Sequence, residues 1–424
     1  MSRREILGAR PTRLERVGQG RRRVTDPPSG TARSGSVHPR PAGCLADIRQ
    51  APPMTLEVRM LSLHNTPKYT RRTVSAAIAA LSLAACSSTS GGGDEPAAGS
   101  DGDVQLVLAI RSLSNPYHAN WVEGAEIFAE SIGQELTVLS DDGDSQKQLS
   151  QIRSLLASGQ TIALNVDPNT SSDTQAIVRA VADAGGYVVT QWNKPDDLMP
   201  ADIGENWVAH VSFDGIESGY QIATALFDEM GGEGGIIALQ GILDNVPAQQ
   251  RFEGLQKALE EYPGIELLDE QTAEWDRNTG FEVTQTLLTK HGEEVQGIWA
   301  ANDNMALGAL EAIKAAGRGG GEVPLVGVDA VPEALDEIES GENGYLATVT
   351  TDAWWQGAVP LVLAYRAAIG EFDVAAATPE QRAFYGTQFL VTQENVAEHM
   401  AAPTAEELQA DIDDPFLRIT APIE

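Results

Sequence analysis

The sequence predicts an α/β protein with two doubly wound parallel sheets, each forming one lobe. From Val104 onward, short apolar runs alternate with segments whose apolar residues repeat at helical spacing. Such alternation is typical of parallel sheets covered by helices on both faces. A polar, proline-containing stretch at 193–207 interrupts the alternation, which then resumes. Two Rossmann-like units in one chain are therefore expected.

The first unit is predicted from four apolar runs and the helical segments between them. The helix after the first strand shows the helical period most clearly, because Trp121, Ala125, Phe128 and Ile132 fall on one face. Strands are expected at 104–110, 136–139, 162–166 and 187–190, and helices around 121–132, 149–156 and 176–184.

The second unit repeats this pattern after the polar stretch. Strands are expected at 208–212, 235–240, 267–274, 297–301, 325–328 and 346–349, and helices at 216–230, 249–262, 281–290, 305–316, 332–340 and 353–369. Ligands of doubly wound sheets bind at the carboxyl ends of the strands. Two lobes that face each other would place those ends around one cleft.

The segment before the folded part is not expected to build a core. Residues 1–59 are rich in Arg, Pro, Gly and Ser and show no apolar periodicity. We interpret them as a disordered or non-native upstream extension, with the true start at Met54 or Met60.

Residues 60–85 are interpreted as an export signal. A basic segment precedes an apolar run at 74–83, which is too short to span a bilayer as a stable helix. Leu83-Ala84-Ala85-Cys86 then resembles a bacterial lipobox, in which the signal is cut before a cysteine that receives a diacylglycerol. Cys86 is therefore expected to carry a lipid, and 86–102 to form a flexible tether. The alternative is an ordinary secretory signal with a chance cysteine.

Charge and cysteine content argue against several functions. After Ala85, 14 basic residues face 56 acidic ones, a formal charge of about −42. Such a surface repels phosphate backbones, so binding to nucleic acid is not expected. No cysteine follows Cys86, so we expect no disulfide and no thiolate metal site in the folded part. The sequence has no nucleophile elbow, no HExxH and no phosphate-binding loop with its lysine, so neither an enzyme nor a cofactor is expected.

Several short motifs occur in a fixed order along the folded part. They are Asn115-Pro116-Tyr117, Asp214 with Gly219, Gln240-Gly241, Arg251 with Gly254, Trp275-Asp276-Arg277, Asn302-Asp303-x-Met305-Ala306-Leu307-Gly308, Val326-Gly327-Val328-Asp329 and Ala347-Thr348-Val349. In order and spacing they resemble type I periplasmic binding proteins of the ribose-binding kind, from about Val104 to Val396.

The resemblance implies two lobes that close on a ligand about a hinge of three chain crossings. The first lobe is expected at 103–212 and 352–385, and the second at 213–351 and 386–424. It also implies an extracytoplasmic, monomeric protein that delivers a sugar or polyol to the permease and ATPase of an ABC importer. One alternative is a sensor that presents its ligand to a membrane receptor. A repressor with the same lobes would need a basic helix-turn-helix where this chain has its lipobox.

The resemblance and the positions of the strand ends together predict which residues contact the ligand. A sugar needs planar hydrogen-bonding groups at its edge and aromatic walls on its faces. The expected contacts are Asn115, Tyr117, His118, Asn165, Trp192, Asn193, Phe213, Arg251, Trp275, Asn302, Asp329 and Thr351.

Some of these residues could also have a structural role that requires no ligand. Asn115 also suits a turn before proline, His118 a helix cap, Asn302 a helix N-cap, and Trp275 a core position. Arg251 offers a fork of donors to two hydroxyls or a ring oxygen. Asp303, by contrast, is interpreted as structural.

The chain departs from the ribose-binding pattern at four expected contacts. Trp192 stands where ribose binders carry Asp, and His118 where they carry a second aromatic. Phe213 replaces a small Ser, and Thr351 a Gln. A different pentose, a hexose, a deoxy sugar or a polyol is therefore expected. Asn165 and Asp167 both follow the third strand, and either can reach the cleft, although this segment also reads as a plain turn.

Overall fold

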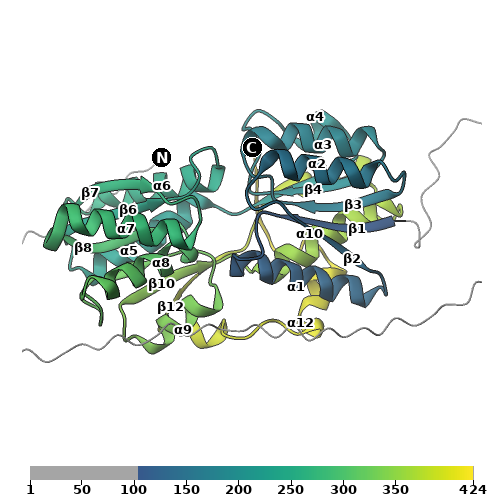
Figure 1. Cartoon of the computed structure of the whole chain (residues 1–424). Helices are drawn as coiled ribbons and strands as arrows, with labels where there is room; N and C mark the ends of the chain where they lie inside the picture. Colours follow the sequence, from purple (N-terminus) through teal and green to yellow (C-terminus); the bar gives the residue numbers. More distant parts are fainter. Residues whose placement is uncertain (1–103, 424) are drawn as a thin grey trace, which may run out of the picture. The chain divides into compact units, whose positions relative to one another are not determined.

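The structure, a computed structural model, describes residues 104–423, all within one compact unit of the chain. Two separate sheets organise them (Figure 1). The first has seven strands in the order β13-β11-β5-β4-β3-β1-β2, and the second has six in the order β12-β10-β9-β8-β6-β7. The predicted fold class is confirmed. The upstream extension, export signal, tether and Cys86 lie outside the described residues.

The first sheet is built from mostly apolar strands that pair in parallel, except for the antiparallel edge pair of β11 and β13, and helices cover both faces. Helices α1 and α10 pack with one buried cluster, while α2 and α3 contribute to a second cluster on the opposite face. The elements are β1 (Val104–Ile110), α1 (Pro116–Ser131), β2 (Leu136–Ser140), α2 (Ser145–Leu156), β3 (Thr161–Val166), α3 (Thr174–Asp183), β4 (Tyr187–Gln191), α4 (Pro200–Ile203), β5 (Trp207–Ser212) and α10 (Ala353–Ala368). We call this the first lobe.

The second sheet repeats the arrangement after the chain leaves β5. Its five parallel strands are joined by crossover helices, as the alternation in the sequence predicts. The elements are α5 (Gly215–Glu229), β6 (Glu233–Gln240), α6 (Val246–Glu261), β7 (Gly264–Thr272), α7 (Arg277–His291), β8 (Val295–Ala300), α8 (Asp303–Ala315), β9 (Leu325–Val326), α9 (Pro332–Ser340) and β10 (Tyr345–Thr350). We call this the second lobe.

The C-terminal part corrects the expected division of the chain. Strand β12 (Phe389–Thr392) pairs with β10 of the second lobe, as expected. Strand β13 (Ile419–Pro422), however, pairs with β11 (Ala383–Gly386) at the edge of the first sheet. Helix α12 (Ala405–Asp413) packs on α10. The chain therefore crosses between the lobes four times rather than three, because the last strand completes an edge that would otherwise leave backbone groups unpaired.

Close helix packing fixes the position of α6, which carries Arg251. A Cβ added to Gly219 of α5 would lie 2.0 Å from the carbonyl oxygen of Arg251, and one added to Gly254 of α6 would lie 2.1 Å from that of Ile216. Only glycine permits this backbone contact on each side. Gly219 and Gly254 thus let α5 and α6 pack closely, and this packing fixes the helix that carries Arg251.

Candidate functional site

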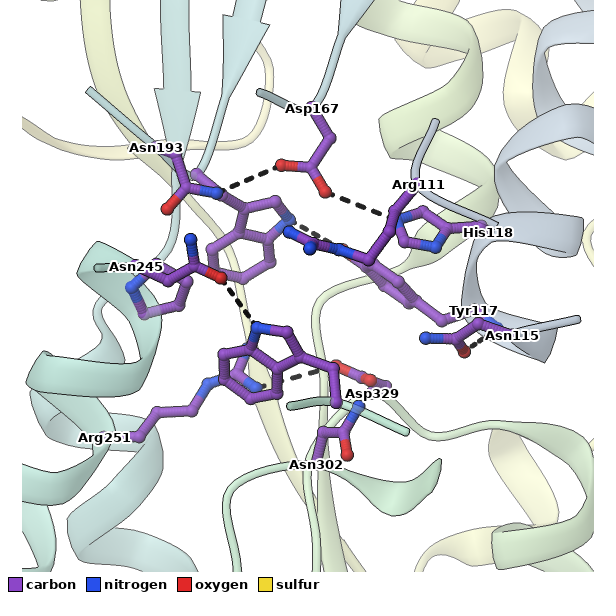
Figure 2. A pocket seen from close by; sticks show the side chains of 13 residues that line it. Arg111, Asn115, Tyr117, His118, Asp167, Asn193, Asn245, Arg251, Asn302 and Asp329 are labelled. Atoms are coloured by element: carbon purple, nitrogen blue, oxygen red, sulfur yellow. Dashed lines mark hydrogen bonds and ion pairs between the residues drawn. The ribbon is translucent and has the colours of Figure 1, made fainter. Parts of the chain in front are cut away.

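Both lobes contribute side chains to one cavity, which lies beyond the carboxyl ends of their strands (Figure 2). The first lobe supplies Arg111, Asn115, Tyr117, His118, Asp167, Trp192 and Asn193. The second lobe supplies Asn245, Pro247, Arg251, Trp275, Asn302 and Asp329. Most of these residues lie in the loops that follow strand ends or at the starts of the next helices, because parallel strands release the chain into loops at that edge of the sheet.

The backbone is strained at three of the lining residues. Trp192, Trp275 and Asp329 have φ of 60°, 65° and 122°, which residues other than glycine rarely adopt. Such conformations cost on the order of 1–3 kcal/mol each and gather at ligand sites and switches. The fold thus holds these three residues in backbone conformations that are unfavourable locally, and in these conformations their side chains line the cavity.

Arg251 is the central cation of the second-lobe side. Its side chain is almost fully buried, and Nη1 donates a hydrogen bond to the carbonyl oxygen of Ala301 at 2.6 Å. Its guanidinium carbon lies 5.2 Å from the ring centroid of Trp192 and 5.6 Å from that of Trp275. Cation–π attraction strengthens when both partners are desolvated. The two tryptophans therefore hold the guanidinium in place, while Nε has no hydrogen-bond partner among the described residues.

Trp275 forms an aromatic wall whose position depends on Gly241. The indole Nε1 donates to Asn245 Oδ1 at 2.7 Å. A Cβ at Gly241 would lie 2.0 Å from the indole ring, so a side chain there is incompatible with this placement. Because its N–H is already bonded within the protein, Trp275 presents apolar surface to the cavity.

Trp192 and Tyr117 are locked by a buried hydrogen-bond chain in the first lobe. Trp192 Nε1 donates to the Tyr117 hydroxyl at 2.9 Å, and that hydroxyl donates to Gln356 Oε1 at 2.7 Å. Phe213 covers Trp192 with a centroid distance of 5.1 Å. Burial raises the pKa of Tyr117 well above its usual value, so the hydroxyl stays protonated and acts as a fixed donor.

Asp167 is the acidic centre of the first-lobe side. His118 Nε2 lies 3.3 Å from Asp167 Oδ2, and Asn193 Nδ2 donates to Oδ1 at 3.2 Å (Figure 2). A carboxylate only accepts, so the histidine carries its proton on Nε2 in this contact. Arg111 lies nearby in the cavity wall and donates from Nη2 to the carbonyl oxygen of Asn169 at 2.9 Å.

Asn302 and Asp329 complete the second-lobe side. Asn302 Oδ1 accepts from the Met305 backbone N–H at 2.9 Å, so this residue is the N-cap of α8 and also lines the cavity. Asp329 Oδ1 lies 3.8 Å from Arg251 Nη1. Burial raises the pKa of Asp329 to about 8, and the nearby Arg251 guanidinium opposes that rise.

Asp303, next to Asn302, is structural, as expected. It is fully buried and does not line the cavity. Its carboxylate accepts from the hydroxyls of Tyr345 and Thr348 at 2.7 and 2.8 Å and from the Val331 N–H at 3.0 Å. These bonds tie the start of α8 to the loop that carries Asp329.

The two lobes touch at the rim of the cavity. The Val246 N–H donates to Asn193 Oδ1 at 3.2 Å, and Asn245 Nδ2 donates to the carbonyl oxygen of Asn169 at 2.8 Å. The Ser171 N–H also reaches the carbonyl oxygen of Asp244, at 3.1 Å. The lobes are therefore closed over the cavity, with direct hydrogen bonds between them.

Three of the predicted contacts lie behind the cavity instead of lining it. Asn165 donates from Nδ2 to the carbonyl oxygens of Gln356 and Gly357, at 2.8 and 3.1 Å. Thr351 accepts from the Gln356 amide at 2.8 Å. Together with Phe213 behind Trp192, these residues hold the cavity wall in place. The sequence pattern places Asn165, Thr351 and Phe213 near strand ends, but it does not show that residues of α10 pack against them.

The other predicted contacts line the cavity together, and four further residues join them. Asp167 is one of them, and the sequence offers it beside Asn165 as a residue that can reach the cleft. Arg111 directly follows β1, so its position at a strand end could have identified it from the sequence as a residue of the cavity. Asn245 and Pro247 begin α6 several residues beyond β6, so strand ends alone did not indicate them.

Among residues 104–423, no helix is long and apolar enough to cross a membrane. The same residues contain no cluster of three or more His, Cys, Asp or Glu side chains arranged to hold a metal ion.

Comparison with known proteins identifies the same fold and arrangement. Residues 106–372 match the model of the periplasmic binding protein domain. The chain is 32% identical over 269 residues to the ribose import binding protein of Haemophilus influenzae, covering 63% of this chain and 86% of that protein.

Solved structures agree with this match. A twin-arginine translocation pathway signal protein from Burkholderia phytofirmans is 41% identical with a TM-score of 0.72, covering 76% of this chain and 98% of that one. A solute-binding protein of an ABC transporter from Bacillus halodurans, with bound myo-inositol, is 28% identical with a TM-score of 0.61, covering 72% of this chain and 100% of that one.

Proposed function

The chain belongs to the periplasmic binding protein family, of the ribose-binding kind, and on this premise we propose that it captures a neutral monosaccharide or polyol for an ABC importer. The two lobes close on the ligand, and the closed protein delivers it to the permease. Closure is favoured when the ligand contacts both lobes at once, because such contacts exist only in the closed state.

The composition of the cavity carries this proposal. Two guanidinium groups, of Arg111 and Arg251, are balanced by two carboxylates, of Asp167 and Asp329. The amide, guanidinium and carboxyl groups can hydrogen-bond many hydroxyls whether Asp329 is protonated or ionised, which suits a neutral ligand with several hydroxyls. Tyr117, Trp192 and Trp275 supply apolar surface for the C–H faces of a sugar ring.

The relatives support the same ligand class. The protein from Haemophilus influenzae is named for ribose import, and the structure from Bacillus halodurans contains myo-inositol. Trp192 stands where the ribose-binding pattern has Asp, so the pattern of hydroxyls recognised here is expected to differ from that of ribose.

Isothermal titration of the purified protein with D-ribose, D-allose, xylitol and myo-inositol tests the proposal. At least one of them is expected to bind and to raise the thermal midpoint, since a ligand at 100 times its Kd stabilises by about 2.7 kcal/mol. Arg251→Ala should abolish binding. Arg318→Ala, whose side chain pairs with Glu322 away from the cavity, is the matched control. Absence of binding to every compound would contradict the proposal.

We further propose that the protein acts outside the cytoplasm as a monomer anchored by a diacylglycerol on Cys86. The order of a basic segment, a short apolar run and Leu83-Ala84-Ala85-Cys86 supports this. Metabolic labelling with radioactive palmitate should mark the wild type and not Cys86→Ser. Label retained in the variant would contradict the anchor, while leaving ligand binding untouched.

A further inference from the structure

A second cavity, of about 290 Å³, lies against the segments in which the chain crosses between the lobes. Thr350 and Asp352 line it from the crossing between β10 and α10, and Thr387 and Phe389 line it from the crossing between β11 and β12. Residues 398, 399 and 401–403 of the last crossing line it as well. We call this space the rear cavity, and its walls belong to both lobes and to the segments that join them.

The rear cavity and the cavity of the candidate site lie on opposite sides of these segments. Asp329 lines the candidate site, and the next residue, Ala330, lines the rear cavity. Thr350 and Asp352 line the rear cavity, whereas Thr351 between them is buried behind the wall of the candidate site. The hinge therefore separates the two cavities.

Rotation about a hinge changes the space on its two sides in opposite directions. Each lobe of a hinged protein turns nearly as a rigid body about the crossing segments. When the lobes part at the candidate site, their walls at the rear cavity must therefore approach each other. The hydrogen bond between Val246 and Asn193 joins the lobes across the rim of the candidate site, so this structure shows the rear cavity in the closed form. Opening narrows it.

Phe389 places a large apolar side chain in the rear cavity. This residue is 54% exposed, and its backbone pairs with Thr350 in the second sheet, so the ring is carried by the second lobe. The ring centroid lies 6.4 Å from that of His399 in the last crossing. Ala402 and Pro403 line the cavity further along this crossing, just before α12, which packs on the first lobe. Opening therefore brings the ring toward small apolar residues on the first-lobe side.

The first-lobe wall can approach the ring because its charged groups already have partners. Arg418 pairs with both Asp352 and Asp411. The carboxylate of Glu407 accepts hydrogen bonds from the backbone N–H and the hydroxyl of Thr404. A charge that loses water without a partner would oppose opening. The existing pairs lower that cost, while the burial of apolar surface favours the open form.

We propose that Phe389 and the residues facing it across the rear cavity form an interface that is buried in the open form and stabilises the ligand-free protein in that form. The closed form leaves the ring in water, at a free-energy cost that the ligand must offset. A ligand binds with lower apparent affinity when only a fraction of the free protein is closed. Phe389 thus lowers the affinity for the ligand and favours its release without contacting it.

The test compares the wild type with Phe389→Ala, Phe389→Leu and Leu417→Ala. Leu417 is a matched control, because it is 61% exposed and lines neither cavity. Small-angle scattering measures the radius of gyration of each protein without ligand. Isothermal titration then measures the affinity for whichever of D-ribose, D-allose, xylitol and myo-inositol binds the wild type most tightly. Thermal unfolding checks that each variant folds.

We expect the ligand-free Phe389→Ala protein to have a smaller radius of gyration than the wild type, because its open form has lost buried apolar surface. Its affinity should rise about threefold or more. Phe389→Leu keeps most of the apolar area and should change both quantities less. Leu417→Ala should leave both unchanged.

Two results for Phe389→Ala would overturn the inference. An unchanged radius of gyration with unchanged affinity would mean that the ring is not buried on opening. A larger radius with weaker binding would mean that it stabilises the closed form instead. If the wild type binds none of the four compounds, the proposed function fails, but the scattering of the ligand-free proteins still tests this inference separately.

Discussion

The guanidinium carbon of Arg251 in the second lobe lies 5.2 Å from the ring centroid of Trp192 in the first lobe. Trp192 also packs against Phe213, with ring centroids 5.1 Å apart, and its Nε1 bonds the Tyr117 hydroxyl. The tryptophan is therefore held by residues of the first lobe and contacts an arginine of the second lobe. At the position where the ribose-binding pattern has Asp, this chain has an aromatic contact between the lobes, and we expect it to act as a latch.

Trp192→Leu should weaken closure. A buried cation–π contact is worth about 2 kcal/mol, so its loss should enlarge the ligand-free protein in small-angle scattering and lower affinity by roughly tenfold or more. Trp354→Leu is the control, because Trp354 bonds Glu123 within the first lobe and does not line the cavity. Unchanged scattering and unchanged affinity in Trp192→Leu would contradict a latch.

Gly241→Ala should displace Trp275 and damage the site with little effect on the rest of the fold. The added Cβ would meet the indole at 2.0 Å, and the ring has to move. Affinity for the bound sugar is expected to fall at least tenfold, with altered tryptophan fluorescence. Gly319→Ala is the control, since the nearest atom to its Cβ is 3.4 Å away. Equal affinities for the two variants would show that Trp275 tolerates the methyl group.

The stability of the protein should fall in acid because of His210. Burial lowers the pKa of His210 to about 3, whereas in the unfolded chain it is about 6.5. Between these values the unfolded chain binds a proton that the folded protein does not. The contribution is therefore complete above about pH 6.5 and decreases by up to about 1.4 kcal/mol per unit as the pH falls toward 3.

Urea unfolding of the wild type and His210→Gln between pH 7 and pH 4 measures this contribution. Thr190 donates to His210 Nδ1 at 2.9 Å, and glutamine retains an acceptor for that hydroxyl. The stability difference between the two proteins should shift in favour of the variant as the pH falls. A difference independent of pH would mean that His210 does not titrate in this range.

Arg418 should stabilise the last chain crossing. It pairs with Asp352 at 2.5 Å and with Asp411 at 2.6 Å, and Asp352 is the N-cap of α10 where the chain re-enters the first lobe. Because Arg418 is about a third exposed, its loss should lower the free energy of unfolding by only about 1 kcal/mol. Arg153→Ala, on an exposed position of α2, is the control for chemical unfolding. Equal stability of the two variants would assign Arg418 no role.

Most of the site was predictable because its residues follow strand ends. Asn193, Asn302 and Asp329 occupy such positions and line the same cavity, whereas Arg251 lies within α6 and was predicted from the family resemblance. Asn165 was expected to follow the third strand but lies within β3, and its side chain turns to the carbonyl groups near the start of α10. A strand end indicates which edge of the sheet a residue reaches, but not which helix covers it.

The sequence by itself determined the two lobes, because apolar periodicity reports locally whether a segment buries one face of a helix or both faces of a strand. It also determined the short loops that carry the site residues. Only the tertiary structure decided that β13 returns to the first sheet, that Trp192 meets Arg251 across the lobes, and that Asp167 is bonded by both His118 and Asn193. These contacts join residues far apart in the chain, so no local pattern encodes them, and the contact between Trp192 and Arg251 also joins the two lobes.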